Sequence, residues 1–345
     1  MQASLDSGQA RPEMAQSGGR SSDTRLTLTR LLDFGLHRNG TAGSLTLIVF
    51  LLAVCGSPSA AQFSFGAFGD TPYNRDEEPQ FVAMIAEMNR QPLAFALHVG
   101  DFKDARAACS DELFLQRRAS FALSHHPFFY TPGDNEWSDC GRASWGRREP
   151  LERLARLRAL FFSQDASLGQ RTLPVERQNR RGYPEHMRWT VESVLFATLN
   201  IPGPDNNRAR MPDESKHRTA ALIEWIRDSF RIARERKLPA LVLAAQANLW
   251  TGRSGYEEIL AALAEEAQRY NGEVLLIHGD THWFRFDRPL VDPRSGHRVE
   301  NVTRLEVYGS PFVNWIYVTV SVANGHAKFS AVPGSRLINK EPAAK

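Results

Sequence analysis

Four aspartates stand directly after a glycine at the end of an apolar, strand-like run. They are Asp70 after FSFGAF, Asp101 after LAFALHV, Asp134 after PFFYTP and Asp280 after EVLLIH, and the chain has no other Gly-Asp pair. A glycine at the end of a strand allows a sharp turn, which presents the aspartate at the sheet edge where α/β proteins gather their sites. A single pair of this kind usually marks an ordinary turn. Four would draw several carboxylates into one crevice, where they repel one another unless a cation is present.

The elements that must position these turns alternate along the chain from Gln62 onward. Short apolar runs alternate with amphipathic segments, which predicts an α/β protein with a parallel or mixed sheet. Residues 164–188 and 200–212 are predicted to be long polar loops. The last three predicted strands have no helix between them and are predicted to form an antiparallel meander. The predicted strands are 63–68, 93–99, 127–130, 191–199, 238–244, 273–277, 304–308, 316–322 and 328–332, and the predicted helices are 79–90, 111–124, 151–162, 213–236 and 256–270.

The order of these motifs resembles the calcineurin-like metallophosphoesterase superfamily, whose five loops usually read D-x-H, G-D, G-N-H-D/E, a lone His and G-H-x-H. The resemblance covers nearly the whole chain after residue 61, and PGDNEWSDC, with VGDFKD and HGDTHW, is similar to a group of secreted bacterial members. The matching residues here are Asp70-Thr71-Pro72, Gly100-Asp101, Gly133-Asp134-Asn135-Glu136, Gln246 and Gly279-Asp280-Thr281-His282.

The resemblance implies a fold and a domain division. The fold is an α/β one, a four-layer α/β/β/α sandwich of two mixed sheets flanked by helices. The phosphoesterase domain is expected to run from residue 62 to 335, after an N-terminal extension and signal peptide (1–61) and before a C-terminal tail (336–345).

The resemblance also implies two divalent metal ions that share Asp101, with Asp70 bound to one of them. Asp134, Gln246, Asp280 and His282 take the remaining ligand positions. Pro72 stands where a histidine ligand is usual, and its side chain has no donor atom. The third-loop aspartate replaces an asparagine, and the glutamine and the fifth-loop aspartate replace histidines.

An oxygen-rich ligand set of this kind suits Mg²⁺, Mn²⁺ or Ca²⁺ better than Zn²⁺ or iron. Asp104 stands where purple acid phosphatases have a tyrosine after the second loop, which disfavours an iron-tyrosinate enzyme. The alternative is that the metal site has become a hydrogen-bonded polar cluster.

The chemistry implied is hydrolysis of phosphate mono- or diesters, either small molecules or lipid-linked ones. Asn135 occupies the position of the usual catalytic histidine, and its amide can orient a phosphate but cannot act as an acid. Glu136, His98, His278 or solvent would then supply the proton to the leaving group. For each of the two histidines, a hydrogen-bonded residue at a strand end is the favoured alternative.

Three further residues are candidate substrate contacts. Lys103 and Arg142 flank the second and third loops, and Asn206 lies in the polar segment LNIPGPDNN. Pairing with a surplus aspartate is the alternative for the two basic residues, and an Asx turn is the alternative for the asparagine. Two functions therefore remain open: a metal-dependent phosphoester hydrolase, and a non-catalytic exported protein that binds a metal or a phosphorylated ligand in the same crevice.

Charge and composition indicate a globular protein and give no support for a nucleic-acid-binding one. The 345 residues are 42% apolar and 23% charged, as in ordinary globular proteins. The net charge of +3 is a small difference between 42 basic and 39 acidic side chains that are interspersed along the chain. Nucleic-acid binding therefore has no electrostatic support.

The N-terminal part of the sequence reads as an export signal. The apolar run 45–55 is too short to span a bilayer, and it precedes small residues at Ser59 and Ala61. Cleavage is predicted after Ala61, which places the mature protein in the periplasm or outside the cell without a stable membrane span. An uncleaved anchor is the alternative. In an oxidising compartment, Cys109 and Cys140 are predicted to form a disulfide, with two buried thiols as the alternative.

Overall fold

Two mixed β-sheets form the centre of the protein, as seen in a computed structural model that describes residues 61–142 and 147–334. The predicted N-terminal extension and signal peptide, apart from Ala61, and the predicted C-terminal tail lie outside the described residues. The first sheet has the order β12-β11-β1-β2-β3 and the second has the order β4-β5-β6-β7-β8-β10-β9. The strands of the first sheet are β1 (Ala61–Phe68), β2 (Ala96–His98), β3 (Phe128–Tyr130), β11 (Ile316–Ala323) and β12 (His326–Pro333). The strands of the second sheet are β4 (Glu176–Gln178), β5 (Tyr183–Val191), β6 (Val194–Thr198), β7 (Ala240–Ala244), β8 (Glu273–His278), β9 (Arg285–Asp287) and β10 (Val302–Glu306).

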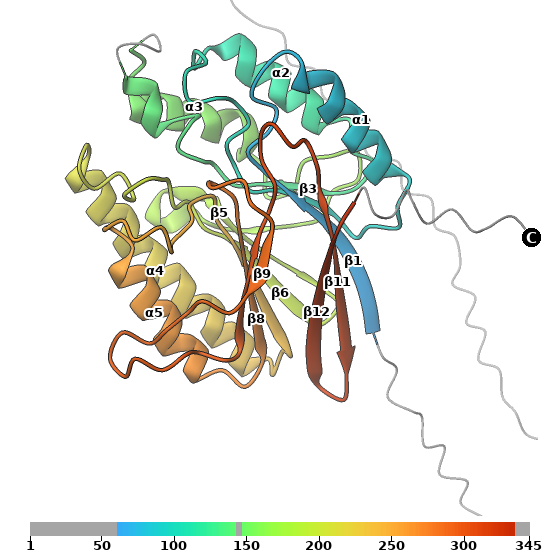
Figure 1. The fold of residues 1–345 in the computed structure, drawn as a ribbon, viewed down its shortest axis with the longest axis vertical. Coiled ribbons are helices and arrows are strands. Elements are labelled where there is room, and N and C mark those ends of the chain that lie inside the picture. Colours follow the sequence, from blue (N-terminus) through green and yellow to red (C-terminus); the bar gives the residue numbers. More distant parts are fainter. Residues whose placement is uncertain (1–60, 143–146, 335–345) are drawn as a thin grey trace, which may run out of the picture. The chain divides into compact units, whose positions relative to one another are not determined.

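Five helices cover the outer faces of the two sheets (Figure 1). The helices α1, α2 and α3 precede the second sheet in the chain and lie together at the top of the picture. The helices α4 and α5 lie along the second sheet. Their start signals are visible in the sequence: Ser110 accepts a hydrogen bond from Leu113 N at 3.2 Å, and Pro150 and Pro212 begin later helices. The helices are α1 (Glu77–Asn89), α2 (Asp111–Phe121), α3 (Pro150–Phe161), α4 (Pro212–Glu235) and α5 (Glu257–Gln268).

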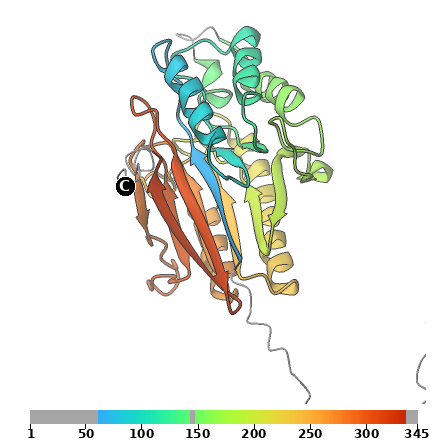
Figure 2. The same ribbon diagram turned by 90° about the vertical axis from the view of Figure 1, so that its right-hand side faces the viewer.

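Aromatic side chains join the two sheets. The ring of Phe196 on β6 lies 5.6 Å from that of Phe65 on β1 and 5.0 Å from that of Phe95, and Phe129 on β3 stacks on Trp189 of β5 at 3.6 Å. A second apolar core lies between β6, β7, β8 and the helices α4 and α5. Figure 2, turned by 90°, shows the strands of both sheets running side by side beneath the helices. The predicted α/β sandwich of two helix-flanked mixed sheets is therefore confirmed.

The predicted C-terminal meander is confirmed for its last two strands, which pair antiparallel, and is wrong for its first strand. β10 pairs in parallel with β8 and antiparallel with β9, whereas β11 and β12 form a hairpin that joins the first sheet through β1. The chain crosses from one sheet to the other in the segment 307–315, which has no helix. β10 and β11 are therefore not neighbours in a sheet, although no helix lies between them in the chain.

The predicted loop 164–188 is also wrong in part, because it contains β4 and the first half of β5. β5 is buried on both faces from Glu185 to Trp189, and two of these buried residues are charged and held in ion pairs. Arg158 lies 2.7 Å from the buried Glu185, and Arg188 lies 2.5 Å from Glu176. An apolar alternation, which is the usual sign of a half-buried strand, is therefore missing here.

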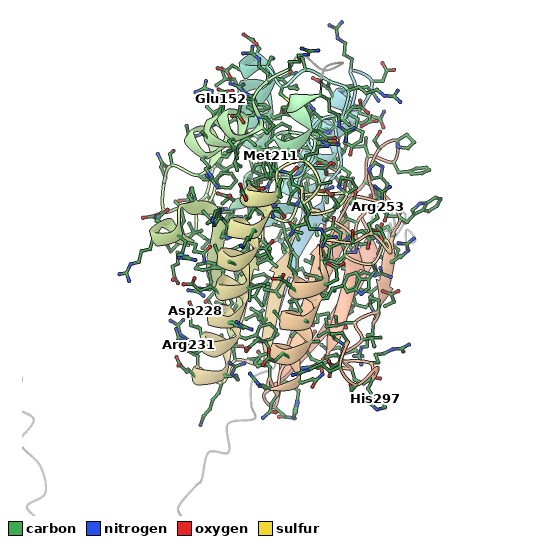
Figure 3. The ribbon with its side chains drawn as sticks, turned by 90° about the vertical axis from the view of Figure 1, so that its left-hand side faces the viewer. Glu152, Met211, Asp228, Arg231, Arg253 and His297 are labelled. Atoms are coloured by element: carbon green, nitrogen blue, oxygen red, sulfur yellow. A yellow bond between two sulfur atoms is a disulfide. The ribbon has the colours of Figure 1, made fainter. Side chains whose placement is uncertain are left out.

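The basic cluster at the end of α4 is a solvated, ion-paired face. Arg231 lies 2.5 Å from Asp228 and 2.6 Å from Glu235, and Arg234 lies 2.7 Å from Glu266 on α5. Figure 3 shows Asp228 and Arg231 together on the outside of α4. None of the described helices is both long enough and apolar enough to cross a membrane.

A buried histidine on β5 predicts how stability depends on pH. Burial lowers the pKa of His186 to about 4, and its Nδ1 lies 2.7 Å from Gln178 Oε1. Below the ordinary histidine pKa of about 6.5, the unfolded chain binds a proton that the native chain does not bind. The free energy of unfolding is therefore expected to fall as pH drops from about 6.5 to 4, by up to about 3 kcal/mol at about 1.4 kcal/mol per pH unit.

Urea unfolding at several pH values between 4 and 7.5 checks this. His186→Gln is expected to show a shallower loss of stability on acidification than the wild type. His125→Gln, at an exposed position, is the control and should keep the wild-type slope. Equal slopes for all three proteins would contradict the expectation.

Candidate metal centre

The predicted site residues lie at the carboxyl ends of parallel strands from both sheets. Asp70, Asp101 and Asp134 follow β1, β2 and β3, which run parallel to one another. Gln246 and Asp280 follow β7 and β8, which are also parallel. Hydrogen bonds join the two groups: Asp280 N donates to Asp70 Oδ1 at 3.1 Å, and Gln246 Nε2 donates to Asp101 Oδ2 at 3.1 Å. The structure thus brings the turns of both sheets to one crevice.

The Tyr73 hydroxyl lies in the part of the crevice that is formed by Asp70, Asp101 and His282. The Tyr73 oxygen is 3.5 Å from Asp70 Oδ1, 3.4 Å from Asp101 Oδ2, and 3.3 Å from His282 Nε2. Asn135 Nδ2 donates to the same hydroxyl at 3.3 Å. Sequence reasoning missed this residue. The signal was present, because Tyr73 is the first residue with a polar side-chain tip after Pro72, where the usual histidine is missing.

The second half of the crevice holds two carboxylates around Gly203. A Cβ atom added to this glycine would lie 3.2 Å from Asp280 Oδ1 and 3.3 Å from Asp134 Oδ1. The other oxygen of Asp280 accepts from Asn248 N at 3.0 Å. Asp134 Oδ1 is buried and has no hydrogen-bond partner among the described residues. An unpartnered buried carboxylate oxygen is costly, and a bound cation is the partner that would remove the cost.

Close packing explains two of the four glycines better than turn geometry does. Of the glycines that precede the four aspartates, Gly100 has a left-handed backbone, with φ of 102°. A Cβ on Gly133 would lie 1.9 Å from Asp101 Oδ1, and a Cβ on Gly279 would lie 1.9 Å from Asp70 Oδ2. These two glycines therefore make room for the carboxylate of a neighbouring loop.

Four site residues adopt the left-handed conformation that non-glycine residues rarely adopt. The φ angles are 51° at Asp70, 56° at Asp101, 76° at Asp280 and 64° at His282. Such backbone costs of the order of 1 kcal/mol or more per residue and concentrates at functional sites. The conformation indicates that the backbone of these turns is held in place so that the four side chains point in defined directions.

The electrostatics of the crevice are those of crowded carboxylates. Burial raises the pKa of Asp101, and the charges of Asp134, Glu136 and Asp70 raise it further. Burial likewise raises the pKa of Asp134, with Asp280 as the next cause, and raises that of Asp280 to about 6. The surplus of negative charge is what a divalent cation would neutralise.

His282 is the one usual histidine ligand that remains. Burial opposes its charged form, but its hydrogen bond and charge interaction with Asp70 raise its pKa to about 9. Its Nε2 lies 3.5 Å from Asp70 Oδ1, and its Nδ1 lies 2.7 Å from the Ser310 carbonyl oxygen. The ring is thus held from both sides.

Glu136 connects the second and third loops. Its Oε1 accepts hydrogen bonds from Asp101 N at 3.1 Å, Gly133 N at 2.8 Å, and Tyr130 Oη at 2.7 Å. Its other oxygen is buried without a partner among the described residues. These contacts make Glu136 a bracket for the loops that carry Asp101 and Asp134.

The three candidate substrate contacts each have a structural partner. Lys103 is buried, and its Nζ donates to the carbonyl oxygens of Asn135 at 2.6 Å and Asp104 at 2.9 Å. Arg142 lies 3.0 Å from Asp139 Oδ1. The Asn206 amide donates to Thr219 and Gly255 and accepts from Arg218. A phosphate contact from Asn206 would have to break these bonds.

The predicted disulfide is present between Cys109 and Cys140, whose Cα atoms lie 5.8 Å apart. Both sulfur atoms lie close to the Asn135 carbonyl oxygen, at 3.7 and 3.8 Å. The bond therefore ties the third loop to the segment that follows the second.

Removing this disulfide is expected to lower stability. A Cys109→Ser/Cys140→Ser variant should lose about 2–4 kcal/mol of unfolding free energy, because the 31-residue separation no longer restricts the unfolded chain. Urea unfolding of the variant and of the wild type, with and without reductant, measures the loss. A reductant effect on the wild type alone is expected, and a reductant effect of the same size on the variant would contradict this reading.

The donor atoms of the crevice are of the type that binds a divalent cation, but they are not arranged at the distances of a coordinated cation. Among residues 61–142 and 147–334, no three His, Cys, Asp or Glu side chains form a group arranged to hold a metal ion. The Tyr73 hydroxyl lies 3.3–3.5 Å from its four neighbours, whereas divalent cations bind oxygen at about 2.0–2.6 Å. The unpartnered Asp134 oxygen beside Asp280 is the position with the best fit.

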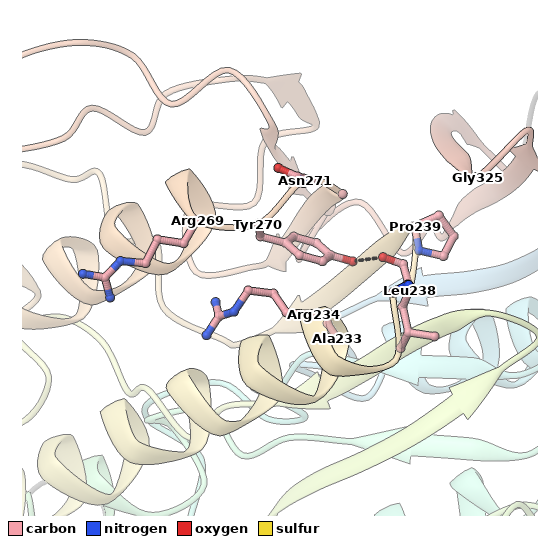
Figure 4. A pocket seen from close by; sticks show the side chains of 10 residues that line it. Ala233, Arg234, Leu238, Pro239, Arg269, Tyr270, Asn271 and Gly325 are labelled. Carbon is pink, nitrogen blue, oxygen red and sulfur yellow. Dashed lines mark hydrogen bonds between the residues drawn. The ribbon is translucent and has the colours of Figure 1, made fainter.

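A separate cavity of about 460 Å³ lies away from this crevice (Figure 4). It is lined by the end of α4, the segment before β7 and residues 269–272 before β8, so it lies at the opposite ends of these strands. Tyr270 Oη donates to the Leu238 carbonyl oxygen at 2.7 Å across it. It has no part in the candidate metal centre.

Comparison with known proteins gives distant structural likenesses. No family model and no curated protein sequence matches the chain. A 5'-nucleotidase from Candida albicans SC5314 is 11% identical with a TM-score of 0.44, and the match covers 81% of this chain and 54% of that one. PhoD is 12% identical with a TM-score of 0.46, over 79% and 68% of the two chains. Vps29 from Entamoeba histolytica, in a complex with Zn²⁺, is 10% identical with a TM-score of 0.25, over 79% and 99%.

The chain thus spans about half the length of the 5'-nucleotidase that it matches. At these identities and TM-scores, the case for function rests on the residues of the crevice. The fold that the resemblance implied is the one observed: two helix-flanked mixed sheets, with the motif-bearing loops gathered at one crevice.

Proposed function

We propose that this chain is a divalent-cation-dependent hydrolase of phosphate mono- or diesters. The observation that supports it most directly is the convergence of Asp70, Asp101, Asp134 and Asp280 in one crevice between the two sheets, with an unpartnered oxygen on Asp134. These four, with Gln246 and His282, are the proposed ligands. Mg²⁺, Mn²⁺ or Ca²⁺ is favoured over Zn²⁺ or iron, because the donors are mostly oxygens.

When bound, the cation would neutralise charge on the phosphoryl oxygens and make a water molecule more acidic. The chain's own residues would do the rest. Asn135 Nδ2, which now donates to Tyr73 and to the Lys103 carbonyl, is placed to turn toward a phosphate oxygen. Arg142 and Lys103 remain proposed phosphate contacts, together with Asn206. Glu136 is the proposed proton donor, alongside its role in holding the loops.

We also propose that the protein is exported after cleavage near Ala61 and acts on a small-molecule or lipid-linked phosphate ester. The disulfide supports an oxidising compartment.

One observation favours the second function, binding without catalysis. The Tyr73 hydroxyl bonds to Asp70, Asp101, His282 and Asn135, so the protein's own donors partly fill the space between the ligands. In that case the crevice would take a metal or a phosphorylated ligand and leave it unchanged.

The metal content of the protein, followed by an activity assay, separates the two functions. Chelator-stripped protein would be reloaded with Mg²⁺, Mn²⁺, Ca²⁺ or Zn²⁺ and assayed with 4-nitrophenyl phosphate and its bis ester. Hydrolysis that returns with one of the oxygen-preferring cations supports the enzyme. Tight cation binding without hydrolysis of either ester supports the binding protein. The absence of cation binding removes the enzyme and leaves only a protein that binds a phosphorylated ligand without a metal.

A further inference from the structure

Two strongly exposed aromatic side chains flank the candidate metal centre. Trp283 is 65% exposed and Phe312 is 60% exposed. The other large apolar side chains that are exposed among the described residues are 39–49% exposed. Trp283 follows His282 directly in the chain, and Phe312 comes two residues after Ser310, whose carbonyl oxygen lies 2.7 Å from the His282 ring. The two most exposed rings are therefore both attached to the same corner of the crevice.

The turn that carries Trp283 is anchored in the buried part of the protein. Trp283 N donates at 3.3 Å to Glu306 Oε1, and the Thr281 hydroxyl donates to the same oxygen. Glu306 is itself fully buried, and Asn248 Nδ2 donates to the Thr281 hydroxyl at 2.8 Å. The exposed indole thus projects from a turn that is fixed on both sides.

The turn that carries Phe312 is anchored to a proposed ligand. Ser310 N donates to the Asp70 carbonyl oxygen at 2.8 Å, and Phe312 N donates to the Gly309 carbonyl oxygen at 2.9 Å. Gly309 packs so closely that an added Cβ would lie 2.5 Å from the Asp70 Cβ and 2.7 Å from the His282 ring. The position of Phe312 is therefore coupled to the position of the site.

Neither ring has an aromatic partner within the described parts of the chain, although the neighbouring Phe284 stacks on Tyr308 at 5.7 Å. The residues after Phe284 are exposed, with Arg285 42%, Phe286 39% and Asp287 48% exposed. Charged side chains on both sides of Phe286 interrupt the apolar surface beyond Trp283. Isolated rings between charged neighbours suit one flat group that stacks on them better than a long aliphatic chain, which needs continuous apolar contact.

We propose that Trp283 and Phe312 form a subsite for a planar aromatic group on the phosphate ester, attached within a few bonds of the phosphorus atom. This inference rests on the proposed function, and it names the class of substrate. Trp283 follows His282 directly and its turn is hydrogen-bonded to the buried Glu306, so in this proposal the indole lies within reach of a group attached to a phosphate held in the crevice. Stacking on an aromatic ring contributes about 0.5–1.5 kcal/mol beyond area burial, which corresponds to up to about tenfold in affinity.

Three esters with similar alkoxide leaving groups test the class: benzyl, cyclohexylmethyl and ethyl phosphate. Trp283→Ala is expected to lower kcat/KM for benzyl phosphate about tenfold and to leave ethyl phosphate unchanged. Cyclohexylmethyl phosphate, which is of similar size but not flat, should lose clearly less, and Trp283→Phe should recover most of the benzyl activity. Leu115→Ala, which removes an exposed side chain on α2, is the control.

Binding of the matching phosphonates, which cannot be hydrolysed, separates this inference from the proposed function. Calorimetry on the Mn²⁺-loaded protein should show benzylphosphonate binding more tightly than ethylphosphonate, with the difference lost in Trp283→Ala. If that result holds while no ester is hydrolysed, the proposed function fails and the aromatic subsite stands. Equal losses for benzyl and cyclohexylmethyl compounds would indicate an aliphatic or lipid substrate and overturn the inference. So would binding that is unaffected by Trp283→Ala, or no phosphonate binding at all.

Discussion

Asp101→Asn is expected to abolish cation-dependent hydrolysis, with a loss of at least about 1,000-fold, because several kcal/mol of charge stabilisation depend on the cation it helps to hold. The substitution keeps the shape of the side chain. Its oxygen can still accept from Asn135 N, which lies 3.1 Å from Asp101 Oδ1, and the amide of Gln246 can turn to accept from the new NH₂ group. A loss of activity would therefore reflect charge and not misfolding.

The same variant is expected to be more stable than the wild type when both are free of cations. Asp101 is buried beside Asp134, Glu136 and Asp70, whose charges raise its pKa, so a neutral side chain relieves repulsion. Thermal unfolding with and without Mn²⁺ measures this: the wild type should gain Tm on adding the cation, and Asp101→Asn should gain little. Asp292→Asn, at a buried aspartate in the loop before β10, is the control that should keep the response. A full cation response in Asp101→Asn would remove it from the ligand set.

Glu136→Ala is expected to lower the free energy of unfolding by about 3–5 kcal/mol, because it leaves three buried donors without an acceptor. Those donors are Asp101 N, Gly133 N and the Tyr130 hydroxyl. Urea unfolding measures the loss, and Glu149→Ala provides the comparison. Glu149 caps α3 through Leu151 N and Glu152 N at an exposed position, so its loss should be about 1 kcal/mol.

Glu136→Gln then distinguishes positioning from proton donation. An amide oxygen can keep the three hydrogen bonds, so stability should stay close to that of the wild type. If Glu136 only holds the loops, kcat for an alkyl phosphate also stays within a few-fold. If it donates the proton, kcat falls about 100-fold or more for an alkyl phosphate, and much less for 4-nitrophenyl phosphate, whose leaving group needs no proton. A stable variant with equal losses on both esters would argue against both roles.

The sequence predicted those parts of the fold that depend on local patterns. The apolar runs that end in Gly-Asp correspond to β1, β2, β3 and β8, and the five predicted helices are present with bounds shifted by a few residues. These elements are buried on one or both faces, so their hydrophobicity reveals them. β5 was missed in part because Glu185 and Arg188 are buried in ion pairs, and a charged residue in a sequence does not show that it has a partner far along the chain.

The sequence predicted that the candidate site residues lie together, but not how they are connected. Asp70, Asp101, Gln246, Asp280 and His282 meet as the motifs implied. The place of Tyr73 directly after Pro72 was visible in the sequence, but its contacts with Asp101 and His282 depend on how the loops meet. The same holds for the hydrogen bonds of Glu136, which no local pattern encodes. The reason for the glycines at 133 and 279 was also hidden, because the atom that excludes a side chain there belongs to another loop.

The division of the acidic turns between two sheets has a consequence for how the protein matures. β1, near the start of the described chain, completes its sheet only by pairing with β11, whose residues lie more than 250 positions later, as in the pair Phe63 and Val320. Asp280 and His282 belong to the other sheet and meet Asp70 once the two sheets have docked. A chain whose C-terminal part has not yet folded therefore lacks a complete set of the proposed ligands, and we expect cation uptake to be among the last events of folding rather than a nucleus for it.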